Sequence, residues 1–122
     1  MHELAIAQAI ADGVCAHAVE ERAVRVTSVR VRIGEAAGVL ADSLIGCFEL
    51  LASEEPLLCG ARLVIERVPH RARCRRCGQE FAVENFVVRC PACDTWEAQV
   101  IGGTELEVRE MEIETQAERV VG

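Results

Sequence analysis

Two Cys-x-x-Cys pairs constrain this chain of 122 residues more than any other feature of its sequence. Cys74 and Cys77 form the first pair, and Cys90 and Cys93 form the second, which gives the pattern C-x2-C-x12-C-x2-C. Each pair places two thiolates on one tight turn, and two such turns brought together make a tetrahedral cage of four sulfur atoms. The spacing therefore predicts a metal-binding module closed by four protein ligands.

A cage without an open coordination position is structural, so we assign no catalysis to this metal. We prefer Zn(II) to the iron of a rubredoxin-type site, because the motif interrupts an α/β chain that contains few aromatic residues. A thioredoxin-like role needs one such motif opening a helix, whereas this chain has two motifs. We expect a short hairpin over residues 79–88, with Phe81, Val83, Phe86 and Val87 covering the site.

The other three cysteines are isolated, and the chain begins Met-His-Glu-Leu without the basic region of an export signal. This pattern favours a cytoplasmic protein with reduced thiols over a disulfide framework. We expect Cys15 and Cys47 to be small core residues of helices, and Cys59 to be exposed in a loop. The longest apolar runs are too short for a membrane span, so we expect no membrane association.

Hydrophobic periodicity predicts the order helix, strand, helix, strand, cysteine module, strand. The predicted elements are a helix over 3–20, a strand over 24–33, a helix from a cap at Asp42 or Ser43 to about Ser53, a strand over 61–68 and a strand from about 100 to 114. The apolar phase changes between Val108 and Met111, which predicts a bulge or two short pieces in the last strand.

These elements predict an α/β (α+β) fold in which a three-stranded sheet carries both helices on one face. The cysteine module is a zinc-ribbon-like insertion. We therefore expect one domain over residues 1–69 and 100–122 and a zinc-binding module over residues 70–99. An uncovered sheet edge permits self-association, so both a monomer and a homodimer remain compatible with the sequence.

Charge bears on the class of partner. The net charge is −7, and every one of the 13 basic residues is an arginine. Such a balance argues against sequence-independent binding of nucleic acid, which requires neutralised phosphates. Five arginines nevertheless surround the module: Arg71, Arg73, Arg75, Arg76 and Arg89. We expect two or three of them to offset the charge of the thiolate cage, and the rest remain open as a patch for nucleic acid or an acidic protein partner.

The N-terminus is the second informative feature. We expect Met1 to be retained, because His2 is not a small residue, and a free α-amine would then lie next to the His2 backbone nitrogen and imidazole. A fourth donor is available from the Glu3 backbone nitrogen or its carboxylate. Nitrogen-rich, roughly square-planar donor sets suit Ni(II) and Cu(II). The simpler alternative is a solvated terminal histidine without a ligand role.

Taken together, the Met-His-Glu-Leu start, the amphipathic first helix and the late cysteine motif resemble the HypA/HybF family of hydrogenase nickel-incorporation proteins. Residues 31–35 and 63–77 also look like that family, and the resemblance covers essentially the whole chain. It implies a nickel metallochaperone and not an enzyme. It further implies work with a HypB-type GTPase and delivery to the hydrogenase large-subunit precursor, in some organisms also with urease accessory proteins.

The resemblance implies nickel at His2, with the Met1 amine and Glu3 contributing. It implies structural zinc at the four cysteines of the module. Some members carry histidines beside the zinc cysteines, whereas this chain has only His70 nearby. Two alternatives remain open, namely a zinc-ribbon module that binds nucleic acid or protein, and a rubredoxin-like iron carrier. We expect His17 at the edge of the first helix's apolar stripe and Trp96 packed where the module meets the sheet.

Overall fold

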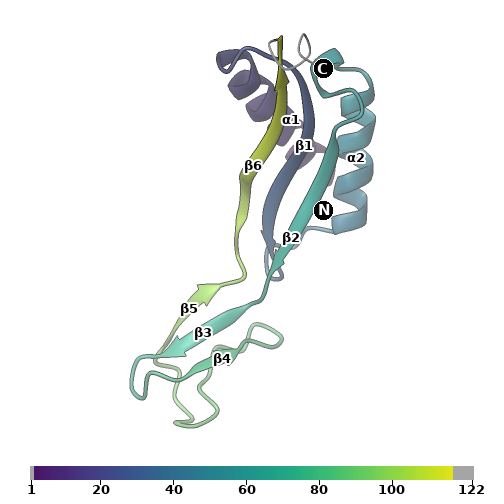
Figure 1. Cartoon of the computed structure of the whole chain (residues 1–122). Helices are drawn as coiled ribbons and strands as arrows, with labels where there is room; N and C mark the ends of the chain where they lie inside the picture. Colours follow the sequence, from purple (N-terminus) through teal and green to yellow (C-terminus); the bar gives the residue numbers. More distant parts are fainter. Residues whose placement is uncertain (1, 117–122) are drawn as a thin grey trace. The chain divides into compact units, whose positions relative to one another are not determined.

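The computed structural model describes residues 2–116 of the chain (Figure 1). The elements are α1 (Glu3–Glu20), β1 (Ala23–Gly34), α2 (Ala41–Ser53), the short 3-10 helix η1 (Pro56–Leu58), β2 (Arg62–Val68), β3 (Arg71–Cys74), β4 (Glu80–Ala82), β5 (Ala98–Gly102) and β6 (Leu106–Thr115). No helix within this described part is long and apolar enough to cross a membrane.

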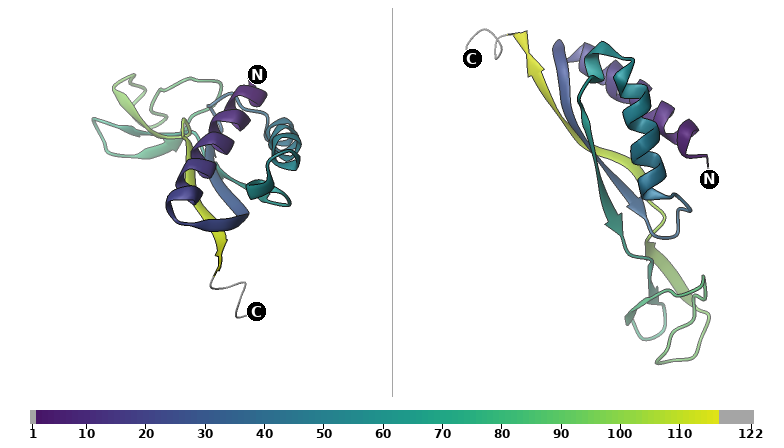
Figure 2. Two further views of the ribbon diagram at one scale, coloured as in Figure 1. Left: turned by 90° about the horizontal axis from the view of Figure 1, so that it is seen from above. Right: turned by 90° about the vertical axis from the view of Figure 1, so that its right-hand side faces the viewer.

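The strands form two small sheets, with the orders β2-β1-β6 and β4-β3-β5. In the first sheet, β1 and β2 run in the same direction and are connected through α2, whereas β6 runs in the opposite direction (Figures 1 and 2). Both helices cover one face of this sheet (Figure 2). The predicted α+β fold, with three strands and two helices on one face, is confirmed. The second sheet was not predicted.

The predicted first helix is confirmed at both ends, and the first two strands are confirmed to within one residue. The predicted cap of the second helix is wrong. The N-cap residue of α2 is Leu40, in an extended conformation and without a side-chain hydrogen bond of its own, instead of Asp42 or Ser43. The reason is a partner far away in sequence, because the Leu40 N–H donates to the Glu3 carboxylate.

The last predicted strand, from about 100 to 114, is two strands in the structure. The chain leaves β5 at Gly102 and enters β6 at Leu106, and β5 pairs with β3 in the second sheet. The break therefore lies at residues 103–105 and not between Val108 and Met111, where β6 continues without interruption.

The described residues fall into two compact units. The first contains residues 2–31, 39–66 and 108–116, and the second contains Arg32–Gly38 and Arg67–Glu107. The core of the first unit is aliphatic except for Phe48, as expected from a composition with few aromatic residues. Its fully buried members come from α1, β1, α2 and η1 and include Ala7, Val26, Val29, Leu44, Phe48 and Leu58.

The second unit has its own small core around the cysteines. Ala72, Phe81 and Val83 are buried there beside two of the cysteine side chains. Phe86 and Val87 were expected to cover the site, but their side chains are 73% and 48% exposed. They lie at the tip of a short hairpin closed by the Glu84↔Val87 bridge, where a positive φ at Phe86 turns the chain outward.

Two backbone segments of the second unit meet at Gly34. The Gly34 N–H donates to the Glu105 carbonyl at 2.8 Å, and the Ala36 N–H donates to the Gly103 carbonyl at 2.7 Å. A Cβ atom on Gly34 would lie 2.0 Å from the carbonyl carbon of Gly103. Only a residue without a side chain allows this approach, which explains why β1 ends at a glycine.

Candidate metal centre

The first Cys-x-x-Cys pair is held by a turn that follows β3. The Cys74 N–H donates a hydrogen bond to the Gln79 carbonyl at 2.9 Å, and the Gly78 N–H donates one to the Cys74 carbonyl at 2.9 Å. Gly78 has a φ of 79°, which a glycine adopts without strain. The backbone N–H groups of Arg76 and Cys77 point at the Cys74 Sγ at 3.3 and 3.5 Å. We call this turn the first knuckle.

The second pair repeats this geometry. The Cys90 N–H donates to the Thr95 carbonyl at 2.9 Å, and the Asp94 N–H donates to the Cys90 carbonyl at 2.8 Å. Asp94, four residues after Cys90, has a φ of 58° in the place that Gly78 occupies in the first knuckle. The Cys93 N–H points at the Cys90 Sγ at 3.4 Å. Each knuckle is therefore fixed by local backbone hydrogen bonds, and this is why its spacing is readable in the sequence.

The structure brings all four cysteines of the motif together. Their sulfur atoms lie within 4.8 Å of one another, and the Sγ atoms of Cys77 and Cys90 are 3.8 Å apart. Four sulfurs placed tetrahedrally about 2.3 Å from one zinc ion would be separated by about 3.8 Å. Cys74 and Cys90 are buried, Cys93 is half-buried and Cys77 is exposed. The residues present therefore fit a four-coordinate metal ion.

The pKa values of two of these cysteines also agree with a metal-binding role. Hydrogen bonds to the Cys74 sulfur, first from the Cys77 backbone N–H and also from Arg76, outweigh its burial and lower its pKa to about 7. The hydrogen bond between Cys93 and the Cys77 sulfur, together with burial and the neighbouring thiolate charges, raises the pKa of Cys93 to about 12. Four thiolates in so small a space repel one another, and a bound cation removes that repulsion.

The arginines around the cage do not bond to its sulfurs. Arg73 forms an ion pair with Glu80 at 2.8 Å, which lowers the pKa of that glutamate, and Arg89 forms one with Asp94. Arg75 and Arg76 are exposed, and neither has an ion-pair partner within the described residues. Backbone N–H groups, and not guanidinium groups, therefore satisfy the sulfur atoms.

Trp96 does not pack where it was predicted. Its side chain is 65% exposed, and the Arg89 guanidinium lies 5.6 Å from the centre of its ring. His70, by contrast, is buried: its backbone N–H donates to the Glu35 carboxylate at 3.3 Å, and its ring meets Phe86 edge-on at 5.6 Å. His70 therefore anchors the second unit instead of standing free beside the cage.

At the other predicted site, Met1 lies outside the described residues. His2 is exposed and has a φ of 47° and a ψ of 26°, and its carbonyl accepts the first helical hydrogen bond from the Ile6 N–H at 3.0 Å. A left-handed residue other than glycine costs roughly 1–3 kcal/mol and is enriched at functional sites. The structure thus holds the His2 imidazole outside the core at the start of α1.

Glu3 has a role that the sequence did not reveal. The residue is 7% exposed, and its Oε2 accepts a hydrogen bond from the Leu40 N–H at 3.2 Å. The carboxylate therefore caps α2 from another helix, where the positive end of the helix dipole stabilises it. No local pattern signals this contact, because the two residues are 37 positions apart.

The remaining candidates do not join either site. Within residues 2–116, the four cysteines of the motif are the only group of three or more potential metal ligands that lie close together. Cys59 is exposed as predicted, whereas Cys15 and Cys47 are only half-buried. His17 is exposed and lies 3.9–4.0 Å from the carboxylates of Glu20 and Glu21.

Comparisons with known proteins agree with this geometry. The family model described as hydrogenase/urease nickel incorporation, metallochaperone, HypA matches residues 1–113. The hydrogenase maturation factor HypA of Geobacter metallireducens is 43% identical over 114 residues, which cover 93% of this chain and 100% of that protein. The protein of the same name from Dehalococcoides mccartyi is 37% identical over 118 residues, covering 97% of this chain and 98% of that protein.

The solution structure of the Ni metallochaperone HypA from Helicobacter pylori matches with a TM-score of 0.68 at 21% identity, covering 95% of this chain and 100% of that chain. A second solution structure of a HypA protein matches with a TM-score of 0.70 at 22% identity, covering 93% and 96% of the two chains. These likenesses show the fold, and the sequence matches show the family. This chain belongs to the HypA family of nickel metallochaperones for hydrogenase maturation.

Proposed function

We propose that this chain captures Ni(II) at Met1, His2 and Glu3 and delivers it to a hydrogenase large-subunit precursor, while Zn(II) at Cys74, Cys77, Cys90 and Cys93 holds the second unit together. The observation that carries the proposal is the closed cage. Four sulfur atoms within 4.8 Å of one another leave no open position for a cargo ion. The cargo must therefore bind elsewhere, and the N-terminus offers the nitrogen donors that nickel prefers.

Zinc is the metal that best fits the cage. Four thiolates in a tetrahedral arrangement select zinc or an iron–sulfur site. Zinc has no redox chemistry, so a site with an exposed ligand such as Cys77 suits it. The unit around the cage has only a small core, so metal binding supplies much of its folding free energy. Purified protein that is red and contains one iron per chain would exclude this assignment and favour the rubredoxin-like alternative.

The Glu3 carboxylate is already engaged by the Leu40 N–H and is buried, so we assign the fourth nickel donor to the Glu3 backbone nitrogen. The other donors are the Met1 amine and the backbone nitrogen and imidazole of His2. All of them must lose protons before they bind a metal ion, so nickel affinity is expected to fall as the pH falls. The exposure of His2 suits a site from which a partner removes the ion.

We assign no catalytic residue and no enzymatic activity to this chain. We expect a partner protein to drive release of the nickel ion, and we propose that this partner is a HypB-type GTPase. We place the reaction in the cytoplasm. We propose the hydrogenase large-subunit precursor as the recipient, with urease accessory proteins as a second recipient in organisms that have both. Titration of the purified chain with each recipient, followed by nickel analysis of the separated proteins, distinguishes them.

The decisive experiment is a nickel titration of tag-free protein by calorimetry, with zinc counted by elemental analysis. Wild-type protein is expected to bind one nickel ion and one zinc ion. His2→Ala is expected to lose stoichiometric nickel binding and keep its zinc. His17→Ala is the matched control, because His17 is also an exposed histidine of the first unit and should leave both metals unchanged. Equal nickel binding by His2→Ala and wild type would refute the N-terminal site.

Exposed Arg75 and Arg76 favour a second role for the zinc-binding unit, as a docking surface for an acidic protein partner. The double reversal Arg75→Glu/Arg76→Glu should weaken binding to the recipient protein without loss of zinc, since neither side chain bonds to a sulfur atom. Arg73→Glu is an unsuitable control because Arg73 pairs with Glu80. Arg62→Glu, on the exposed face of β2 in the first unit, serves instead. A gel shift with nucleic acid at low salt would support the nucleic-acid alternative.

A further inference from the structure

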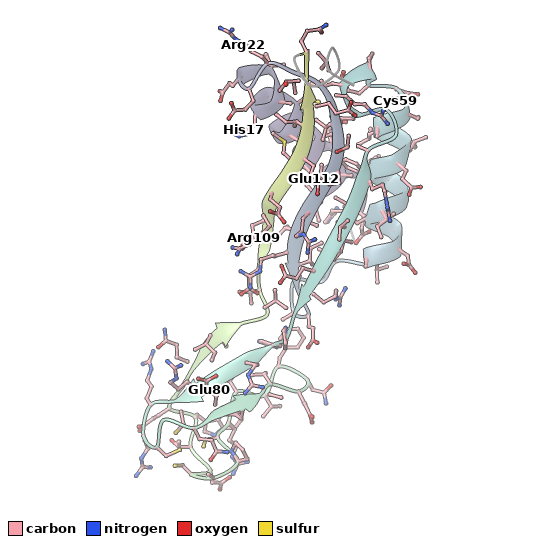
Figure 3. All side chains as sticks on the ribbon, in the orientation of Figure 1. His17, Arg22, Cys59, Glu80, Arg109 and Glu112 are labelled. Atoms are coloured by element: carbon pink, nitrogen blue, oxygen red, sulfur yellow. The ribbon has the colours of Figure 1, made fainter. Side chains whose placement is uncertain are left out.

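A groove runs between α1 and β6 in the first unit, and neither predicted metal site uses it. Its volume is about 530 Å³. It is lined by Gly13, Val14, His17 and Glu21 of α1 and by residues 108–111 and 113 of β6. Figure 3 shows His17 and Arg109 on the outer side of β6, away from β1. We call this feature the α1/β6 groove.

One wall of the groove is the free edge of a sheet. In the order β2-β1-β6, β6 has a neighbour on one side only among the described residues. The backbone N–H and C=O groups of its outer edge are therefore available to another strand. The apolar side chains beside this edge are incompletely covered: Val108 is 45% exposed, and Met111 and Ile113 are half-buried.

The opposite wall contains a glycine that the chain itself does not require. Gly13 lies in the middle of α1, where glycine costs roughly 0.5–1 kcal/mol relative to alanine. A Cβ atom built on Gly13 would meet no other atom within 4 Å. No packing contact within the chain requires a glycine at this position. Because Gly13 faces an unpaired strand edge, its lack of a side chain would allow another backbone to approach closely.

Charge decides which kind of strand fits. Across the inner edge of β6, Arg25 pairs with Glu114 at 3.9 Å and Arg30 pairs with Glu110 at 3.1 Å. The side chain of Glu112 lies between these two pairs in sequence, is exposed and has no ion-pair partner among the described residues. Its position on β6 is labelled in Figure 3. Of the three glutamates between residues 108 and 115, two are neutralised by arginines of β1, so Glu112 is the carboxylate that a basic residue of an added strand would meet.

We propose that the α1/β6 groove binds an extended segment of a partner protein in which apolar and basic residues alternate, added as a fourth strand to the outer edge of β6. Backbone hydrogen bonds supply the pairing, and alternate side chains supply the specificity. The inner neighbour of β6 already shows the required pattern: in β1, Val29, Val31 and Ile33 are buried and alternate with Arg30 and Arg32. We therefore expect an added strand on the outer edge of β6 to carry the same alternation of apolar and basic side chains as β1 does on the inner edge.

The test uses the full-length, zinc-loaded chain and a fluorescent peptide that copies residues 24–33. The control peptide carries glutamate in place of its three arginines. Anisotropy should report saturable binding of the first peptide and none of the second. Hydrogen exchange should show added protection of backbone amides within residues 108–113 and no change in α2.

Two matched substitutions at one position locate the binding. Gly13→Gln fills open space and should fold normally, but its side chain blocks the groove and should weaken binding by at least about tenfold. Gly13→Ala should bind like wild type because it adds only a methyl group. Glu112→Arg should also weaken binding, whereas Glu49→Arg on the exposed face of α2 should not.

Absence of binding by the arginine peptide would overturn the proposal, and so would equal binding by Gly13→Gln. Sedimentation gives the third test. A wild-type dimer that Gly13→Gln converts to a monomer would show that a second copy of this chain occupies the groove, and would also overturn the proposal. None of these outcomes depends on nickel binding, so the groove and the proposed metal sites stand or fall separately.

Discussion

Replacing Gly34 by alanine is expected to destabilise the protein severely, although the change adds a single methyl group. The added Cβ would lie 2.0 Å from both the carbonyl carbon and oxygen of Gly103, and 2.4 Å from the Thr104 nitrogen. All three are backbone atoms, so no side-chain rotation relieves the overlap. The two segments must separate by more than an ångström before ordinary van der Waals contact is restored, at about 3.4 Å or beyond.

The size of the effect follows from what holds these segments together. The hydrogen bonds from Gly34 to Glu105, at 2.8 Å, and from Ala36 to Gly103, at 2.7 Å, would both be stretched beyond bonding range. Each contributes about 1 kcal/mol net, and overpacking adds roughly 1–3 kcal/mol. Alanine also lowers the conformational entropy of the unfolded chain, which stabilises the folded state by about 0.5–1 kcal/mol. The free energy of unfolding should therefore fall by about 3 kcal/mol, or about 12 °C in Tm for a domain of this size.

Thermal unfolding followed by circular dichroism, with zinc present, measures this change. Gly13→Ala is the matched control, because the same substitution meets open space in the middle of α1. It should raise Tm by a few degrees, since alanine gains up to about 1 kcal/mol over glycine in a helix. A Tm for Gly34→Ala within two or three degrees of wild type would refute the packing of the Gly34–Gly103 contact as described.

Three further predictions concern Glu3, Glu105 and the metal cage. Glu3→Ala should destabilise the first unit by about 1 kcal/mol through loss of the α2 cap. Glu3→Gln keeps a hydrogen-bond acceptor for Leu40, so it should retain most of the stability in urea unfolding. It should also still bind one nickel ion per chain in calorimetry. The Glu105 carboxylate accepts hydrogen bonds from its own backbone N–H and from Gly103, the latter at 2.7 Å, which lowers its pKa in the folded protein below the ordinary 4.5. Its contribution to stability is therefore present above pH 4.5 and is lost as the pH falls through the lowered folded pKa, so urea unfolding of Glu105→Gln should show a flatter pH dependence there than wild type. Removal of the metal by a strong chelator should collapse the dispersed NMR signals of residues 71–102 and leave those of α1 in place, and folded signals throughout would contradict a structural role for the metal.

The parts of the structure that were predictable are those that short-range rules determine. The apolar stripe of α1 and the alternation of Val29, Val31 and Ile33 in β1 each fix one buried face. The cysteine cage was predictable for the same reason, because the hydrogen bonds of each knuckle close within six consecutive residues. In these regions the residues that decide the geometry are neighbours in the sequence, so the spacing alone reveals them.

The incorrect predictions concern features that depend on residues far apart in the sequence. The cap of α2 depends on Glu3, and the break between β5 and β6 depends on the approach of Gly103 to Gly34 and to His70. The apolar phase change near Val108 suggested a break, but β6 absorbs it without one. The contacts of β6 with β1 keep one register along this stretch, because Arg32 pairs with Glu107 and Arg25 pairs with Glu114.

Glu3 shows how one residue serves both the fold and the proposed function. Its carboxylate ties the start of α1 to the start of α2, and in our proposal its backbone nitrogen is the donor to nickel. In our proposal, the nickel donors therefore lie at an exposed chain end next to a firmly anchored residue, whereas the zinc donors lie on two closed knuckles. A partner could displace these nickel donors one at a time, starting from the exposed His2, whereas Cys77 is the only exposed cysteine of the cage. The same small chain can thus retain one metal ion and release the other.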